Sequence, residues 1–80
     1  MDSLTKHTAA APASARTIVV NGAARLSTAV TLAALLTEAG YSDAKVATAR
    51  NGDFVPERLR ATTLLTDGDQ IEIVSPRQGG

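Results

Sequence analysis

The chain has 80 residues and no cysteine, and its eight basic and eight acidic residues give no net charge. A chain of this length forms one domain and buries only about 60% of the surface that its unfolded form exposes, which leaves no room for a deep active site. Zero net charge argues against the general electrostatic affinity of a nucleic-acid-binding protein. The lack of cysteine excludes disulfides, a thiolate nucleophile and sulfur ligands for a metal.

Residues 1–15 contain one large apolar side chain, Leu4. We expect a disordered arm, because this segment cannot bury enough apolar surface to offset the entropy of ordering it. His7, the only histidine, lies in the arm and receives no role. The chain start lacks a secretory signal and no apolar run approaches the ~18 residues of a membrane span, so we expect a cytoplasmic protein with no membrane partner. A transit peptide is the alternative interpretation of the arm, and Asp2 argues against it.

Residues 16–20 are rich in β-branched side chains and precede Asn21-Gly22, the strongest short-range signal for a type I′ hairpin turn. We expect a strand over 16–20 and a returning strand at about 23–27.

A helix should follow this hairpin, capped by Ser27 or Thr28. Its buried face is predicted by the i, i+3, i+4, i+7 spacing of Leu32, Leu35, Leu36 and Ala39. Gly40 supplies the left-handed residue that ends the helix.

Residues 45–50 are typical of a third strand, with Val46 and Thr48 on one face and a second Asn-Gly turn behind it. Residues 54–56 are too short and too limited by proline for a central strand, so we place them at the sheet edge. Residues 57–65 predict a short helical turn and a loop, with an apolar side made by Leu59, Leu64 and Leu65.

Residues 66–69 form a turn, and a final strand follows directly. By the two-residue period, Ile71 and Ile73 share the core face of this strand, while Glu72 and Val74 share the opposite face. Asp67 and Asp69 could be imagined as a magnesium site or an acid–base pair. Carboxylates in a turn before a strand usually bond nearby amides, so we interpret both as structural.

The expected order is two strands, a helix, a third strand, an irregular stretch and a last strand. A hairpin followed by a helix that crosses to further strands indicates an α+β fold, with a mixed sheet packed on one main helix. This architecture is the ubiquitin-like β-grasp, and we assign it to residues 16–75. Residues 76–80 are expected to be a flexible tail that ends in Gly79-Gly80.

The Gly-Gly end is the most informative feature for function. Two residues without Cβ atoms let the backbone thread a narrow slot and present an unhindered carboxylate to another enzyme. The alternative is an ordinary chain end rich in small residues.

Several features occur together in one order: the Asn21-Gly22 hairpin, the helix that ends at Gly40, Asn51-Gly52-Asp53-Phe54-Val55-Pro56, Asp67-Gly68-Asp69-Gln70-Ile71-Glu72-Ile73 and the terminal Gly79-Gly80. Together they resemble the ThiS family, the sulfur carrier proteins of thiamine biosynthesis. The resemblance covers about residues 16–80 and leaves the arm outside.

The resemblance implies that a ThiF-like activating enzyme uses Mg-ATP to adenylate the Gly80 carboxylate. A persulfide donor such as a cysteine desulfurase then converts Gly80 to a thiocarboxylate, which gives its sulfur to an intermediate on thiazole synthase (ThiG). The chain would be a protein co-substrate and not an enzyme, with no cofactor or metal of its own. No glycine is followed by lysine, so there is no P-loop and the partner must hold the nucleotide.

A docking patch beside the tail is the second functional expectation. Val74 is predicted to be exposed on the face opposite the core pair, where Phe54 or Val55 would join it. Arg77 and Gln78 flank the tail and either contact the activating enzyme or form a solvated linker.

Three rival functions share or approach this fold. A MoaD-like small subunit of molybdopterin synthase has the same tail chemistry, and the short first strand with its Asn-Gly turn favours the thiazole carrier over it. A ubiquitin-like protein modifier stays open, since an activated tail also acylates lysines. An RNA-binding β-grasp module is disfavoured by the net neutrality of the chain.

Overall fold

The computed structural model describes residues 14–41 and 45–75. Residues 1–13 of the expected arm and all of the expected tail lie outside this part of the chain. The elements follow one another as β1 (Arg16–Val20), β2 (Ala23–Ser27), α2 (Leu32–Glu38), β3 (Ala47–Arg50), β4 (Asp53–Val55), the 3₁₀ helix η1 (Glu57–Thr62) and β5 (Gln70–Val74).

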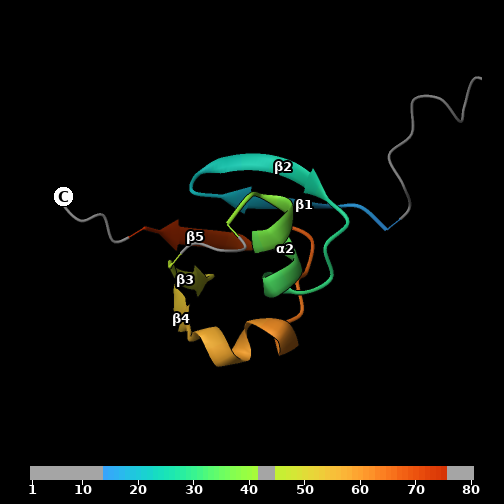
Figure 1. Cartoon of the computed structure of the whole chain (residues 1–80). Helices are drawn as coiled ribbons and strands as arrows, with labels where there is room; N and C mark the ends of the chain where they lie inside the picture. Colours follow the sequence, from blue (N-terminus) through green and yellow to red (C-terminus); the bar gives the residue numbers. More distant parts are fainter. Residues whose placement is uncertain (1–13, 42–44, 76–80) are drawn as a thin grey trace, which may run out of the picture.

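The strands form one sheet in the order β2-β1-β5-β3-β4. The central pair, β1 and β5, is parallel, and the other neighbouring pairs are antiparallel. Helix α2 lies against one face of this sheet, and η1 follows β4 at its edge (Figure 1). The predicted α+β fold, a ubiquitin-like β-grasp with a mixed sheet on one main helix, is confirmed.

Both Asn-Gly turns have the predicted conformation. Asn21 and Asn51 each have φ near +51°, and Gly22 and Gly52 have φ near +88° (87° and 89°). Two successive residues with positive φ are what a type I′ turn requires, and this turn matches the twist of the flanking strands. The hairpins 16–27 and 47–55 therefore follow from local sequence alone.

The helix begins later than predicted. Its N-cap is Thr31, whose hydroxyl accepts a hydrogen bond from the Ala34 amide at 3.1 Å. Ser27 is the last residue of β2, and its hydroxyl accepts from the Ala29 amide at 3.0 Å. The chain needs the intervening residues to pass from the sheet to the helix layer, so the prediction of Ser27 or Thr28 as the cap is wrong. Gly40 follows the helix with φ +93°, as predicted.

The core is small and aliphatic, and three strands and the helix contribute most of it. Its buried apolar residues are Ile18, Ala29, Leu32, Leu35, Leu36, Val55, Leu65, Ile71 and Ile73.

The apolar side predicted for residues 57–65 is only partly present. Leu65 is buried, but Leu59 and Leu64 are 43% and 63% exposed. The 3₁₀ turn buries none of its residues, so it rests on the fold without supplying core side chains.

The side chain of Asn21 extends the sheet beyond the end of β1. Its Oδ1 accepts from the Ile73 amide at 2.8 Å, and its Nδ2 donates to the Ile73 carbonyl at 3.2 Å. The Asn51 side chain makes a similar contact at the other end of β5, where its Oδ1 accepts from the Gln70 amide at 2.8 Å. These two turn residues therefore hold β5 from both sides.

Asp69, which is 5% exposed, closes the turn before β5. Its Oδ2 accepts from Arg50 Nε at 2.7 Å and from the Thr66 amide at 2.8 Å, and its Oδ1 accepts from Asn51 Nδ2 at 3.0 Å. Burial raises the pKa of Asp69, but the hydrogen bonds from Arg50, Asn51 and Thr66 outweigh burial and hold that pKa below its ordinary value of 3.8.

We predict that Asn21→Gly weakens the end of β5 without changing the turn. Glycine accepts the positive φ at this position, while the two hydrogen bonds to Ile73 are lost, at about 0.5–1.5 kcal/mol each. Amide hydrogen exchange at Ile73 should accelerate, because the Asn21 oxygen is the acceptor of that amide. Asn21→Asp, which keeps an acceptor, is the control, and unchanged Ile73 protection in Asn21→Gly would contradict this role.

We predict that Asp69→Asn destabilises the fold near pH 7 by about 1.5–3 kcal/mol, the range for hydrogen bonds to a charged group. The unfolded state binds the proton of Asp69 more tightly than the folded state. The stabilisation is therefore complete above the unfolded pKa and lost as the pH falls through the lower folded value. Denaturant unfolding of both proteins at several pH values should show their difference shrinking below about pH 4. A difference that does not vary with pH would refute the assignment.

Candidate functional site

Strand β5 is the last strand before the carboxyl end of the chain. Its last residue, Val74, pairs with Ala47 of β3, and Ser75 follows it. The predicted reacting residues Gly79 and Gly80, and the flanking Arg77 and Gln78, lie outside the described residues. The part of the site that the structure describes is therefore the surface around the end of β5, at the root of the tail.

Val74 and Phe54 share the sheet face that carries no helix. Ala47 pairs with Val74, and Ala49 pairs with both Glu72 and Phe54, so these side chains project to the same side. Val74 is 60% exposed and Phe54 is 69% exposed. The prediction that Val74 is an exposed aliphatic residue opposite the core pair is confirmed.

Val55 does not belong to this surface. It pairs with Thr48 on the core face and is only 7% exposed. The expectation that Val55 helps to form a docking patch is therefore corrected, and Phe54 is the residue that accompanies Val74. A two-residue turn pairs Arg50 with Asp53 and hence Thr48 with Val55, so the turn length together with the face of Thr48 was the signal for this assignment.

The helix-free face extends across the rest of the sheet. Leu26 of β2 is 61% exposed, and it lies on the same face because it pairs with Thr17 next to the buried Ile18. We use the name open sheet face for the set Val19, Ala24, Leu26, Ala47, Ala49, Phe54, Glu72 and Val74. Its only charged member is Glu72. Leu26 was not predicted from the sequence, although the alternation along residues 23–27 carried the signal.

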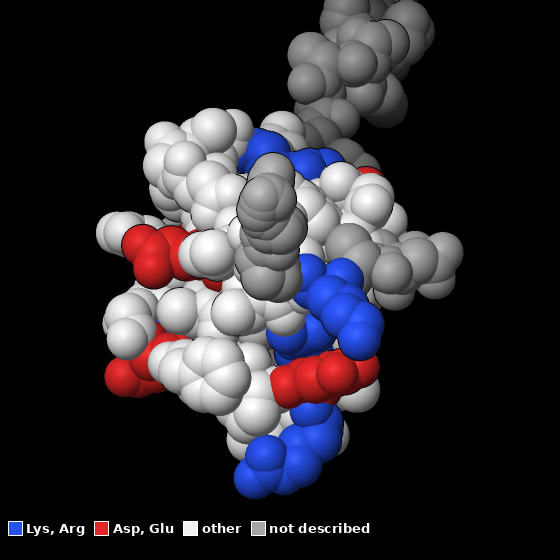
Figure 2. All heavy atoms as spheres, turned by 60° about the vertical axis from the view of Figure 1, so that its left-hand side comes forward, with Lys and Arg blue, Asp and Glu red and all other residues white. Residues whose placement is uncertain are grey.

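The view along the end of the sheet shows how charge is distributed around this surface. In Figure 2 acidic side chains lie on the left, a further acidic group lies among the basic side chains on the right and below, and uncharged residues lie between the two sides. A centre poor in charge with a polar rim is a feature of many surfaces that bind another protein.

The two turn carboxylates are structural, as predicted. Asp67 Oδ1 accepts from the Thr17 amide at 2.7 Å, and Asp69 is engaged by Arg50. Within residues 14–41 and 45–75, no group of three or more His, Cys, Asp or Glu side chains is arranged to hold a metal ion. In the same part of the chain, no helix is both long and apolar enough to cross a bilayer.

The open sheet face, the mixed five-stranded sheet and its single main helix define a small ubiquitin-like β-grasp protein. Residues 12–80 match the model of the ThiS family. The chain therefore belongs to the ThiS family, which confirms the resemblance drawn from its motifs. The match starts at residue 12, slightly before the expected boundary, and includes Gly79-Gly80.

Two of the similar proteins illustrate the relationship. Thiazole synthase from Paramagnetospirillum magneticum is 42% identical over 64 residues, which are 79% of this chain and 20% of that protein, so the chain spans about a fifth of the length of this relative. The crystal structure of the thiamine biosynthesis protein ThiS from Geobacter metallireducens superposes with a TM-score of 0.68 at 24% identity, covering 80% of this chain and 99% of that one. At this identity the second comparison supports the fold alone.

We predict that Val74→Asp leaves the domain folded and that Ile73→Asp unfolds it. The charge at position 74 stays in water, whereas the charge at position 73 replaces a side chain that is 6% exposed in the core. Thermal unfolding should show little change for Val74→Asp and for the neutral control Val74→Thr. If Val74→Asp were the more destabilising of the two aspartate variants, the assignment of the two faces would be inverted.

Proposed function

We propose that this protein is a sulfur carrier of thiamine biosynthesis that carries the sulfur as a thiocarboxylate on Gly80. The observation that carries the proposal is the ThiS family match, which runs over residues 12–80 and so includes the Gly-Gly end. The fold supports it, because β5 is a central strand that carries the chain directly to this end.

The proposed chemistry has three steps, in which the side chains of this protein take no part. An oxygen of the Gly80 carboxylate attacks the α-phosphorus of Mg-ATP on a ThiF-like enzyme, and pyrophosphate leaves. The terminal sulfur of a persulfide, from a cysteine desulfurase or a related donor, then attacks the acyl carbon, and AMP leaves. A thiol finally cleaves the sulfur–sulfur bond, supplying the two electrons that release the Gly80 thiocarboxylate.

Glycines at the last two positions suit this chemistry. A carboxylate oxygen of Gly80 must first reach the α-phosphorus of ATP, and a sulfur nucleophile must then reach the acyl carbon, within a channel of the activating enzyme. A residue without Cβ leaves the backbone narrow and free in φ and ψ, so the carboxylate reaches the reacting atoms without a steric penalty.

Thiazole synthase is the acceptor that we propose for the sulfur. The similar protein from Paramagnetospirillum magneticum bears that name, and the part that resembles this chain is a fifth of its length. The presence of a segment similar to this chain within a thiazole synthase supports the proposal that the two kinds of protein act together.

The open sheet face is the surface that we propose for docking the activating enzyme and thiazole synthase. Val74, on the last strand, and Phe54 are exposed apolar anchors of this face, and Glu72, whose partner Ala49 also pairs with Phe54, is its one charge. Burying an unpaired charge at such an anchor costs about 1–3 kcal/mol or more. A single aspartate at an exposed anchor should therefore weaken binding of a partner while leaving the stability of the domain unchanged. Arg77 and Gln78 are proposed as polar contacts beside the tail.

The test of the proposal is the intact mass of the protein isolated from its own cells. A fraction heavier by the replacement of one oxygen with one sulfur, mapped to the last peptide, is expected. Rescue of thiazole auxotrophy, as opposed to molybdenum-cofactor deficiency, separates this function from that of a MoaD-like subunit. Absence of the heavier species in cells grown without thiamine would refute the carrier function.

We predict that Gly79→Val abolishes adenylation and leaves thermal stability unchanged. The added β-branched side chain obstructs the channel but lies beyond β5, which ends at Val74. ATP–pyrophosphate exchange with the purified activating enzyme measures the first step, and Gly79→Ala is the graded control. Near-normal exchange by Gly79→Val would mean that the channel is not restrictive there.

Two further variants separate docking from chemistry in the same assay. Deletion of Gly80 should remove exchange at any carrier concentration, because it misplaces the reacting carboxylate. Val74→Asp should raise the concentration needed for half-maximal exchange by about tenfold, which corresponds to 1.4 kcal/mol. Normal sulfur transfer after deletion of Gly80 would sink the proposal.

A further inference from the structure

The two edges of the sheet differ in how they are protected. Edge strand β4 has three residues, starts at Asp53 and is followed by Pro56, which has no amide hydrogen to offer a new strand. Short length, charge and proline are the usual means of blocking an edge. Edge strand β2 has five residues, contains no proline and carries the exposed Leu26. Of the two edges, β2 is the open one.

The register fixes which backbone groups of β2 point outward. The amide of Val19 donates to the carbonyl of Asp69, directly before β5, and the amide of Asn21 donates to Ile71 of β5, so the alternate residues of β1 bond to β2. Ala24 and Leu26 of β2 lie opposite Val19 and Thr17. Their amide and carbonyl groups therefore point away from β1, in the plane of the sheet and toward the free edge. They form a short row of donors and acceptors at the free edge.

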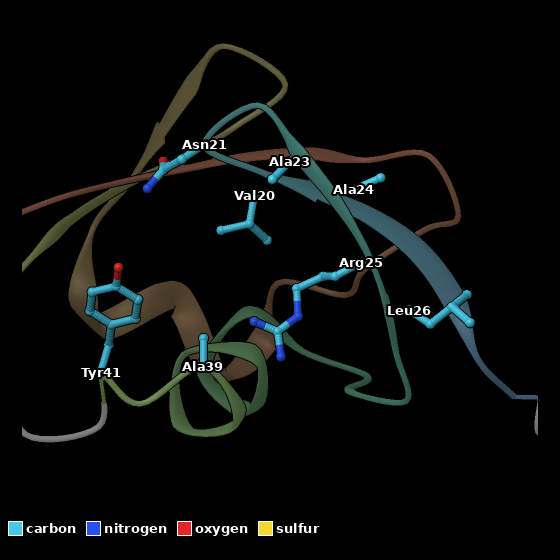
Figure 3. Close-up of a pocket in the computed structure, with 8 residues that line it drawn as sticks. All are labelled: Val20, Asn21, Ala23, Ala24, Arg25, Leu26, Ala39 and Tyr41. Atoms are coloured by element: carbon cyan, nitrogen blue, oxygen red, sulfur yellow. The ribbon is translucent and has the colours of Figure 1, made fainter.

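A hollow of about 560 Å³ lies beneath this edge, between the hairpin and the end of α2. Figure 3 shows the side chains of Val20, Arg25 and Tyr41 directed into it, whereas those of Ala24 and Leu26 point away. Ala23 and Ala39 leave the hollow open, because each ends at Cβ. Arg25 also contacts Glu38 at 3.5 Å, which uses only part of its hydrogen-bonding capacity.

We propose that the β2 edge binds an extended segment of another protein as a sixth strand, with a carboxylate opposite Arg25. This inference goes beyond the sulfur-carrier function and does not depend on it. The backbone groups of Ala24 and Leu26 pair with the added strand. If the added strand is antiparallel, the residue two positions after its carboxylate lies opposite Ala23, over the hollow, and a β-branched aliphatic side chain fits there.

The charge of Arg25 selects another protein over a second copy of this chain. In the symmetric antiparallel pairing of two β2 strands that joins Ala24 to Leu26, the two Arg25 residues face each other as a non-hydrogen-bonded pair. Such pairs have Cα atoms only about 4.5 Å apart, and like charges there are destabilising. A carboxylate at that position is instead attracted.

The proposed site lies apart from the last strand, β5. Strand β2 is separated from β5 by β1, which places it roughly 10 Å away at the usual spacing of about 4.8 Å between strands. A protein bound at the β2 edge can therefore hold the carrier while the chain end is used elsewhere.

The test is an NMR titration of the full chain with capped eight-residue peptides that alternate threonine and valine. The probe peptide carries a central glutamate with isoleucine two positions later, and the matched peptide carries lysine in place of the glutamate. At millimolar concentration the glutamate peptide should shift the amide resonances of Ala24 and Leu26 and the ring resonances of Tyr41. The lysine peptide should bind roughly fivefold more weakly, as expected for reversing one cross-strand charge pair.

Two variants of the protein sharpen the test. Arg25→Glu should reverse the preference between the peptides. Ala24→Pro should abolish binding of both while the hairpin stays folded, because it removes an outward amide and none of the bonds to β1; Ala24→Thr is its control. Three results would overturn the proposal: no shift at Ala24 and Leu26, equal affinity for the two peptides, or concentration-dependent shifts of these amides without peptide, which indicate pairing of two copies.

Discussion

The structure depends most on how strand β5 is held in the middle of the sheet. Its residues 71–74 pair with β3, but only Gln70 and Ile71 pair with β1. Two asparagine side chains supply the missing bonds, Asn21 at Ile73 and Asn51 at Gln70. Each asparagine sits in a turn that needs positive φ, so one residue shapes a hairpin and secures the strand that leads to the chain end.

This arrangement explains why the surface at the root of the tail is well defined in a domain with so small a core. A one-residue slip of β5 would exchange its two faces, burying Glu72 and exposing Ile73. The bonds from the asparagines and the salt bridge between Arg50 and Asp69 lock the register at both ends of the strand. Val74 is thereby kept outward on the open sheet face, beside the point where the tail begins.

The parts of the fold that were predictable from sequence are those set by local chemistry. Asn-Gly turns, the alternation in residues 70–74 and Gly40 each act within a few residues, and each was predicted correctly. The cap at Thr31 was missed because Thr31 also forms a bridge with Leu64, far away in the sequence. The contact between Asn21 and Ile73 was missed for the same reason, since 52 residues separate them and only the closed sheet brings them together. Leu59 was misplaced because a 3₁₀ turn does not present the single apolar stripe of an α-helix. Leu64 lies beyond that turn, where its backbone forms a bridge with Thr31 and its side chain is exposed.

The candidate site also has one part that was predictable from local sequence and another that depends on distant contacts. Val74 followed from the two-residue period, but its neighbours Phe54 and Leu26 come from other strands and needed the register to be placed. A domain of this size holds few side chains that can be spared from its core, so it is suited to functions that use its backbone and surface. The proposed carrier chemistry uses a terminal carboxylate, the open sheet face uses apolar side chains not needed in the core, and the β2 edge uses backbone groups left unpaired when the sheet ends. The open sheet face and the β2 edge share Ala24 and Leu26, but the face uses their side chains and the edge uses their backbone groups, so neither use requires the fold to open.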